Sequence, residues 1–210
     1  MKKLLLIISM LMFSTFARAE MHPKAEYIDK LQKEVFQIMS KKDLKPRQIR
    51  QIAVDHYMKY IDFEWNSRMA IGKAWKNLSP DEQKEYIKEY TLFLAYTWLP
   101  KLNYNTNDGV RIKVKPDVIP INKKDDNVVV HIITPDSKVY EVFIRVREYE
   151  ENMFKITNVT VEGIDLAMSY RVQFEQYIEQ NGGSSQKLLQ YIKDKNEENK
   201  KNVDFTVNLK

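Results

Sequence analysis

The sequence predicts an α+β fold, with one antiparallel sheet of about four strands and helices packed on one face of it. Apolar residues recur at helical spacing from residue 25 to residue 99, alternate with polar residues between 110 and 161, and return to helical spacing from 166 to 192. Consecutive strands joined by short turns favour antiparallel pairing. A block of strands flanked by blocks of helices is typical of α+β domains.

The first block divides into four predicted helices. They cover 25–40, a segment that opens at Pro46, 69–78, and a segment from Pro80 to its end at Pro100. Ser79 is placed to cap the last of these, and Glu82 completes a capping box three residues later. This is the strongest helix start in the chain.

The middle block contains four predicted strands, at 110–115, 128–133, 140–147 and 154–161. The turn sequence Asn107-Asp108-Gly109 precedes the first, and Pro135-Asp136-Ser137 separates the second from the third. In the fourth strand the apolar phase slips by one position at Asn158, which predicts a bulge or a change of buried face.

Two helices follow the strands. The first covers 166–180 and is closed by Asn181-Gly182-Gly183. The second carries Leu188, Leu189 and Ile192. From Lys193 onward charge dominates and apolar residues become rare, so we expect a flexible, solvated tail over 194–210.

The first residues have the organisation of a secretory signal peptide. Lys2 and Lys3 precede a short apolar run over 4–16, and Ala17-Arg18-Ala19 matches the pattern of a cleavage site. The apolar run is too short to cross a bilayer as a helix. We therefore expect cleavage after Ala19, secretion of a soluble product, and a single domain over 20–193.

Composition excludes several classes of function. The chain has no cysteine, which excludes disulfides and a thiol nucleophile. The formal charge of +5 falls to +2 once the three basic residues of the leader are removed, too little to indicate nucleic-acid binding. The glycines are not clustered as in a phosphate-binding loop, and His56 and His131 lack the neighbours of a metal site. We predict no catalytic residues, no metal and no cofactor.

Two stretches resemble the MlaC family, also described as a toluene-tolerance auxiliary family. The first reads FEWNSRMAIGKAWKNLSPDEQKEYIKEYTLFL and contains the family's glycine-x-x-tryptophan element as Gly72 and Trp75. A Ser/Thr-Pro-x-x-Gln helix start follows, with Gln83 as its last residue.

The second stretch, FKITNVTVEGIDLAMSYRVQF, is similar to the family pattern W-x-I-x-D-V-x-x-E-G-V-S-L-x-x-x-Y-R-x-Q-F. Phe154 stands where tryptophan is common and Asn158 where aspartate is common, and both changes preserve packing or hydrogen bonding. The likeness covers roughly residues 28–192.

The resemblance implies a cystatin-like or nuclear-transport-factor-like roll that encloses an apolar cavity for phospholipid acyl chains. It implies a monomeric periplasmic carrier in a Gram-negative host, where it helps to maintain outer-membrane lipid asymmetry. The implied partners are an inner-membrane MCE-domain protein of an ABC transporter and an outer-membrane lipoprotein complex.

On this basis we assign one face of each strand, and the helix residues opposite it, to the cavity wall. Ordinary core packing is the alternative for each of them. The predicted lining residues are Ile71, Trp75, Phe93, Leu94, Trp98, Tyr104, Val130, Ile132, Tyr140, Val142, Ile144, Val146 and Ile164.

Tyr170 and Arg171 are adjacent on the predicted helix 166–180, so they face directions about 100° apart and act as separate anchors. Tyr170 is predicted to pack inward with Phe174. Arg171 is predicted to hold a neighbouring carboxylate or carbonyl, with a lipid phosphate as the alternative. Gly163 permits a tight turn before this helix.

Two other functions remain open. A related carrier would hold another apolar lipid, such as a hopanoid. An isomerase or dehydratase on the same fold would need His131 or an inward carboxylate as its base. The predicted inward strand positions are all apolar except for the Tyr140 hydroxyl, which favours a carrier.

Overall fold

The computed structural model describes residues 20–101 and 109–209. The predicted leader and Tyr104 lie outside these residues. The elements in chain order are α1 (Pro23–Met39), α2 (Pro46–Tyr57), α3 (Phe63–Ile71), the 3₁₀ helix η1 (Gly72–Asn77), α4 (Pro80–Trp98), the 3₁₀ helix η2 (Leu99–Lys101), β1 (Arg111–Pro120), β2 (Asp125–Ile133), β3 (Val139–Glu150), β4 (Met153–Val161), β5 (Ile164–Asp165), α5 (Leu166–Gln180) and α6 (Ser185–Lys200).

The described strands form one antiparallel sheet in the order β1-β2-β3-β4-β5. The α+β prediction is confirmed, with a short fifth strand added. The turn before β5 consists of Glu162 and Gly163, which both have positive φ, 50° and 78°. A two-residue hairpin of this kind requires positive φ at both positions, which explains why glycine stands at the second.

The predicted irregularity in the fourth strand is a β-bulge. Arg145 of β3 pairs with Asn158, but the next residue, Val146, pairs with Ile156. Thr157 therefore has no cross-strand pairing residue on β3. Thr157 and Asn158 are both buried, and the Asn158 side chain accepts a hydrogen bond from the Ala167 N–H at the start of α5 (3.2 Å). The bulge therefore positions α5 against the sheet.

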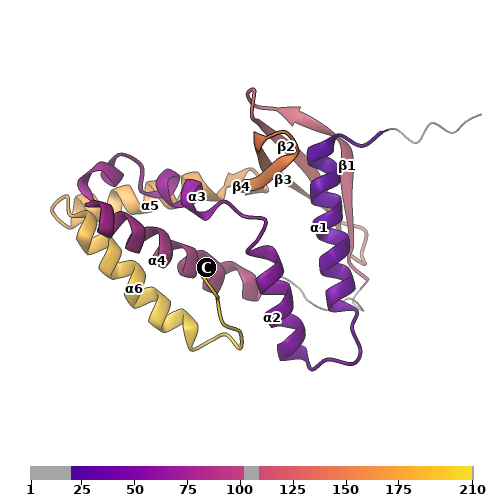
Figure 1. The fold of residues 1–210 in the computed structure, drawn as a ribbon, viewed down its shortest axis with the longest axis horizontal. Helices are drawn as coiled ribbons and strands as arrows, with labels where there is room; N and C mark the ends of the chain where they lie inside the picture. Colours follow the sequence, from indigo (N-terminus) through magenta and orange to yellow (C-terminus); the bar gives the residue numbers. More distant parts are fainter. Residues whose placement is uncertain (1–19, 102–108, 210) are drawn as a thin grey trace, which may run out of the picture.

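The helices fall into two groups around the sheet (Figure 1). α1 packs on β1 and β2, and α2 packs back against α1. α3 and α5 adjoin β4, while α4 and α6 pack against each other farther from the sheet. None of the helices in the described part of the chain is both long and apolar enough to cross a membrane.

Side-chain caps determine where α3 and α4 begin. Ser79 and Glu82 form the predicted capping box of α4, with the Ser79 N–H donating to the Glu82 carboxylate (2.7 Å). α3 begins at Phe63, earlier than the predicted Met69, because Asp62 caps it by accepting from the Trp65 N–H (2.9 Å). Residues 72–77 of that predicted helix are 3₁₀ instead, since Gly72 ends α3.

The buried apolar residues form three clusters instead of one core. The sheet cluster lies between α1 and the sheet, and the helix cluster lies among α3 to α6. A third, smaller cluster lies between α2, α4 and the chain end; we call it the strap cluster. Its buried members are Val54, Ala95, Tyr96, Leu99, Phe205 and Val207.

The end of the chain differs from the predicted flexible tail. α6 continues to Lys200, and Phe205 and Val207 beyond it are buried. Polar residues hold this part of α6 in place of apolar ones: the buried Asn196 donates to the Glu89 carbonyl (2.9 Å) and Lys193 pairs with Glu85 (2.6 Å). A criterion based on apolar residues cannot detect such contacts.

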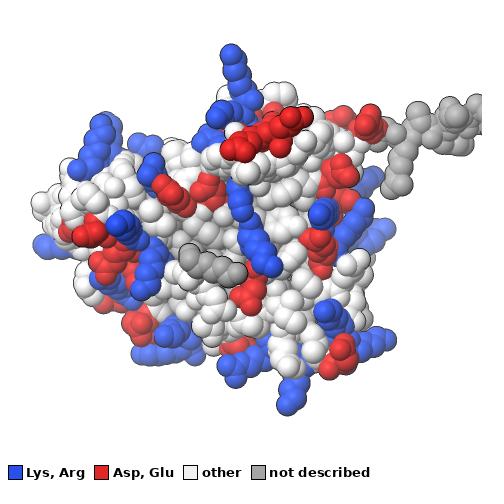
Figure 2. Space-filling model, in the orientation of Figure 1, with Lys and Arg blue, Asp and Glu red and all other residues white. Residues whose placement is uncertain are grey.

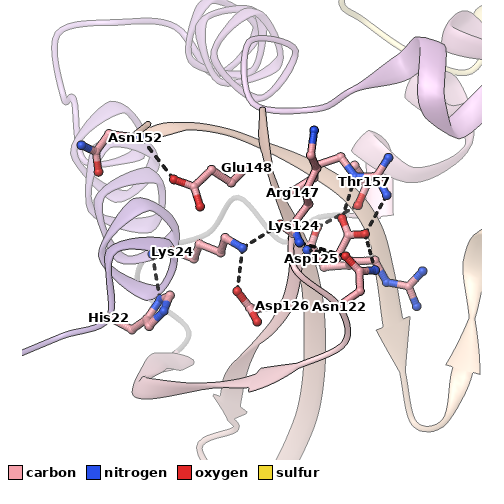
Figure 3. Close-up of polar contacts among 11 residues, drawn as sticks. His22, Lys24, Asn122, Lys124, Asp125, Asp126, Arg147, Glu148, Asn152 and Thr157 are labelled. Atoms are coloured by element: carbon pink, nitrogen blue, oxygen red, sulfur yellow. Dashed lines mark hydrogen bonds and ion pairs between the residues drawn. The ribbon is translucent and has the colours of Figure 1, made fainter. Parts of the chain in front are cut away.

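Two ion pairs fix the start of β2 (Figure 3). Lys24 of α1 is buried and donates to the Asp126 carboxylate (2.6 Å) and the Lys124 carbonyl (2.7 Å). Arg147 donates to both carboxylate oxygens of Asp125 (2.7 and 2.6 Å), whose side chain is 2% exposed. α1 and β3 are thereby fastened to the same turn.

Burial of Asp125 works to raise its pKa. The hydrogen bonds from Arg147 and Asn122 outweigh this, so the pKa lies below its ordinary value. The carboxylate is therefore charged in the folded protein at neutral pH, and its charge contributes to stability.

Replacing Asp125 with asparagine should lower the free energy of unfolding at pH 7 by about 3 kcal/mol, because Arg147 loses its charged partner. The folded-state pKa is depressed, so the carboxylate stabilises fully above its unfolded pKa of about 3.9, and this contribution is lost as the pH falls. Urea denaturation at pH 7 and pH 3 should therefore show a smaller loss with acid in D125N than in the parent.

The matched control is Asp117→Asn, at an exposed carboxylate on the same sheet. It should change the free energy of unfolding by no more than about 0.5 kcal/mol. Equal stabilities for D125N and D117N would show that the Asp125–Arg147 pair does not fasten the sheet.

Candidate functional site

One face of the sheet is apolar across all its strands. We call it the inner face, because α1 packs on it. Cross-strand pairing arranges its side chains in rows, two of which are Ile112–Ile132–Tyr140 and Val114–Val130–Val142–Val161–Ile164. Residues of a row lie on one face and within side-chain contact distance of their neighbours.

Burial of the inner face decreases from one end to the other. Val128 and Val146, near the start of β2, are fully buried in the sheet cluster beneath α1. At the opposite end Tyr140 is 38% exposed, Ile112 49% and Ile164 58%. We call this the open end. The described residues leave a continuous strip of apolar surface there.

The opposite face of the same strands carries charged side chains at this end, next to the apolar pair Ile133 and Val139. Lys113, His131 and Glu141 are cross-strand neighbours on it, and His131 Nε2 lies 3.2 Å from Glu141 Oε2. The strip on the inner face differs from it, because both of its rows consist of apolar or aromatic side chains.

Aromatic side chains of α4 and α5 form the largest part of the helix cluster. The rings of Phe93 and Tyr170 lie edge to face at 5.3 Å, and the Trp98 ring N–H donates to the Tyr170 hydroxyl (2.8 Å). Burial raises the pKa of Tyr170, and the hydrogen bond from Trp98 opposes this in part. The hydroxyl therefore stays protonated at neutral pH and acts as a structural group.

A family model for the MlaC protein matches residues 29–194 of the chain. The chain belongs to the MlaC family. A phospholipid-binding protein from Ralstonia solanacearum, solved in complex with a phospholipid, has a similar fold, with a TM-score of 0.69 and 21% sequence identity. The alignment covers 83% of this chain and 97% of that one. Among curated proteins, none matches the chain.

The family's two sequence motifs meet in space. Arg171 of α5 pairs with Glu175 (3.0 Å), and both side chains lie against the backbone of Gly72. A Cβ atom on Gly72 would lie 3.1 Å from Arg171 Nε and 3.1 Å from Glu175 Oε1. The predicted carboxylate partner of Arg171 is confirmed, as is the contact of Tyr170 with Phe174, whose rings are 5.8 Å apart. A surface hollow of about 640 Å³ adjoins Arg171 and Glu175.

The predicted lining residues of this MlaC-family protein divide between the two larger clusters. On the helix side Ile71 is buried, and Trp75, Phe93, Leu94 and Trp98 pack partly exposed against the helix cluster. On the sheet side the residues share the inner face: Val130, Ile132, Val142, Ile144 and Val146 belong to or pack on the sheet cluster, while Tyr140 and Ile164 lie at the open end. Their contact with lipid stays a prediction.

Three residues of the two rows are absent from that prediction. Ile112, Val114 and Val161 complete the rows, and the period-two alternation in residues 110–115 and 154–161 is the signal that places them there. The described residues contain no cluster of three or more His, Asp or Glu side chains that could hold a metal ion.

Gly72 should not tolerate a side chain. Its φ of 59° with ψ of −131° is a conformation that essentially only glycine adopts, and a Cβ would displace the Arg171–Glu175 pair. We expect Gly72→Ala to lower the free energy of unfolding by about 2–3 kcal/mol, measured by urea denaturation.

Gly183→Ala provides the comparison, since Gly183 also has positive φ, 79°, but no heavy atom lies within 4 Å of its would-be Cβ. That variant should lose about 1 kcal/mol from backbone strain alone. Equal losses in the two variants would mean that close approach of Arg171 is not the reason for glycine at position 72.

Proposed function

We propose that the protein is a phospholipid carrier whose acyl chains lie on the inner face of the sheet, between the open end and the aromatic residues of α4 and α5. The observation that carries the proposal is the exposed apolar strip that the described residues leave at the open end. The phospholipid bound by the Ralstonia solanacearum protein of similar fold supports this class of ligand.

The energetics explain why such a carrier needs a large apolar surface and no chemistry. Moving one acyl chain of about 16 carbons into water costs on the order of 12 kcal/mol, at roughly 0.8 kcal/mol per CH₂. Two chains make unassisted crossing of an aqueous compartment negligible. The protein has to offer an apolar wall of equal area and release the lipid unchanged.

The proposed setting is the periplasm, reached by means of the leader over 1–19. There the protein would take lipid from, or deliver it to, an outer-membrane lipoprotein complex and an inner-membrane MCE-domain protein of an ABC transporter, and so maintain outer-membrane lipid asymmetry. Membership of the MlaC family and the signal-peptide pattern support this setting.

An isomerase or dehydratase is less well supported. Its base would be His131, but this side chain lies on the opposite face of β2 beside Glu141, away from the inner face. A hopanoid carrier shares the apolar surface and differs in the ligand alone. The identity of the bound lipid separates it from the proposal.

The proposal is tested by secreting the mature protein into a Gram-negative periplasm and weighing the purified complex by native mass spectrometry. We expect about one phospholipid per chain. Organic extraction then identifies the lipid class. A protein without lipid, under conditions that keep complexes intact, would contradict the proposed function.

Ile132 and Ile133 offer a matched pair of variants for locating the site. They are neighbours on β2 with similar partial burial, but Ile132 faces the sheet cluster on the inner face and Ile133 faces the other side. We expect Ile132→Arg to lower lipid occupancy at least about tenfold, because a charge on the apolar wall costs several kcal/mol, and Ile133→Arg to leave it unchanged.

Thermal unfolding of both variants checks that each is folded. If I132R and I133R retain lipid equally, the acyl chains do not lie on the inner face of the sheet.

A further inference from the structure

The last described residues, Val203–Leu209, form a segment outside the helices and strands that we call the C-terminal strap. It follows α6 and runs back toward the middle of the molecule (Figure 1). It lies beyond residue 194, where the family match ends. Apolar and polar residues alternate along it, with Phe205 and Val207 buried and the residues between them exposed.

Residues 204, 206 and 208 of the strap form hydrogen bonds with side chains of α2. Arg50 donates to the Asp204 carboxylate (Nε to Oδ1, 2.8 Å), and Arg47 donates to the Asp204 carbonyl (3.1 Å). The Gln51 amide bonds both the N–H and the carbonyl of Thr206, each at 2.8 Å, as a neighbouring strand would. Asn208 donates to Asp55 at 3.4 Å.

The hydrogen bonds set a regular register between the two segments. They join positions 47, 51 and 55 of α2, which lie about one turn apart, to positions 204, 206 and 208 of the strap. This register leaves Phe205 and Val207 on the opposite side, directed at α4.

The apolar side of the strap fills the seam between α2 and α4. Phe205 and Val207 pack in the strap cluster with Val54 of α2 and Tyr96 of α4, and the rings of Phe205 and Tyr96 lie 6.1 Å apart. Val54 of α2 is buried in the same cluster as Ala95 and Tyr96 of α4, and Phe205 and Val207 lie among them. The strap is therefore one of the links between α2 and α4.

This link joins two halves of the molecule. One half consists of the sheet with α1 and α2, and the other consists of α3 to α6. On one side, α2 is held to α1 by Glu34, which accepts from the Tyr60 hydroxyl (2.6 Å) and lies 2.9 Å from His56, and Tyr57 packs on the sheet cluster. On the other side, α4 and α6 belong to the helix cluster. The proposed lipid site lies between the sheet and helix clusters.

We propose that the C-terminal strap is a latch that holds the two halves together and so limits how fast lipid enters and leaves. The inference rests on the proposed function, because it assigns the strap a role at that same site. With the strap released, α2 can separate from α4, and the inner face of the sheet opens toward the helix cluster. Lipid then exchanges faster, while the surface that binds it is unchanged.

The experiment measures transfer of a labelled phospholipid between the mature protein and vesicles of phosphatidylethanolamine and phosphatidylglycerol. Phe205→Ala with Val207→Ala removes the buried side of the strap. It should speed transfer by at least about tenfold, since buried large-to-small changes of this size shift a closed–open equilibrium by more than that. Thr206→Ala is the control, because Thr206 is exposed and makes its hydrogen bonds to Gln51 through its backbone. It should leave the rate unchanged.

A second variant avoids the buried residues and so keeps the test valid should the double alanine variant fail to fold. Asp204→Arg breaks the ion pair with Arg50 at the surface and should speed transfer about two- to fivefold, in line with the modest strength of exposed pairs. Adding Arg50→Asp restores the pair with its charges exchanged. This double variant should return the rate toward that of the parent.

Hydrogen exchange of the α2 amides reports the latch independently of lipid. In F205A/V207A and in D204R these amides should exchange faster than in the parent and in T206A. Unchanged transfer rates together with faster exchange in α2 would overturn the proposal. If the parent carries no lipid, the proposed function fails, and the latch is then judged by hydrogen exchange alone: faster exchange supports it, and unchanged exchange overturns it.

Discussion

Among the described residues, α1 and the side chains of Tyr57, Tyr60 and Ile61 pack on the inner face of the sheet but do not cover all of it, and the rest of the architecture depends on this mismatch. An α-helix with its side chains is about 10–12 Å across. Strands lie about 4.8 Å apart, so a five-stranded sheet is roughly 20 Å wide between its outer strands. α1 buries Val128 and Val146, but Ile112, Tyr140 and Ile164 remain exposed at the other end. A second apolar layer is needed there, and in a carrier the ligand supplies it.

Polar contacts join the two halves of the molecule. In a domain with a single core, apolar packing would continue through these points. The Asp62 carboxylate caps α3 and accepts a hydrogen bond from the Tyr149 hydroxyl of β3, and burial together with this bond raises the pKa of Tyr149 to about 12. Arg147, while paired with Asp125, lies over the Trp65 ring at 4.9 Å. Directional contacts of this kind fix where α3 begins without filling the space beside the sheet.

The sequence was a good guide wherever local patterns decide the outcome. The capping box at Ser79, the alternation in the strands and the slip at Asn158 all rest on neighbouring residues, and each is confirmed. The α5 helix, bounded by Leu166 and Gln180, matches its predicted range for the same reason. The family resemblance agreed with these patterns and was confirmed by the match over 29–194.

The sequence failed where partners are distant in the chain. The sequence predicts a solvated tail over 194–210 because apolar residues are few there, yet Phe205 and Val207 are buried against residues more than a hundred positions away. The start of α3 was missed for another reason: its signal is the single local cap from Asp62 to the Trp65 N–H, which lies ahead of the apolar periodicity used to predict the helix. The predicted lining residues were treated as one wall, whereas they belong to two clusters, because periodicity assigns a face to each element but does not say which faces meet.

The division into clusters explains how a lipid carrier can bind its ligand tightly and still exchange it. A single packed core has one shape, because close-packed side chains have no alternative arrangement of similar energy. Here the sheet and helix clusters are separate, and they are joined by the strap cluster, by the contacts of α3 and α5 with β4, and by polar bonds such as that of Asp62 with Tyr149. Separating α2 from α4 therefore disturbs the small strap cluster and a few polar bonds, and leaves the two larger clusters intact. Under the proposed function, the free energy that governs lipid release is confined to contacts that do not hold the fold together.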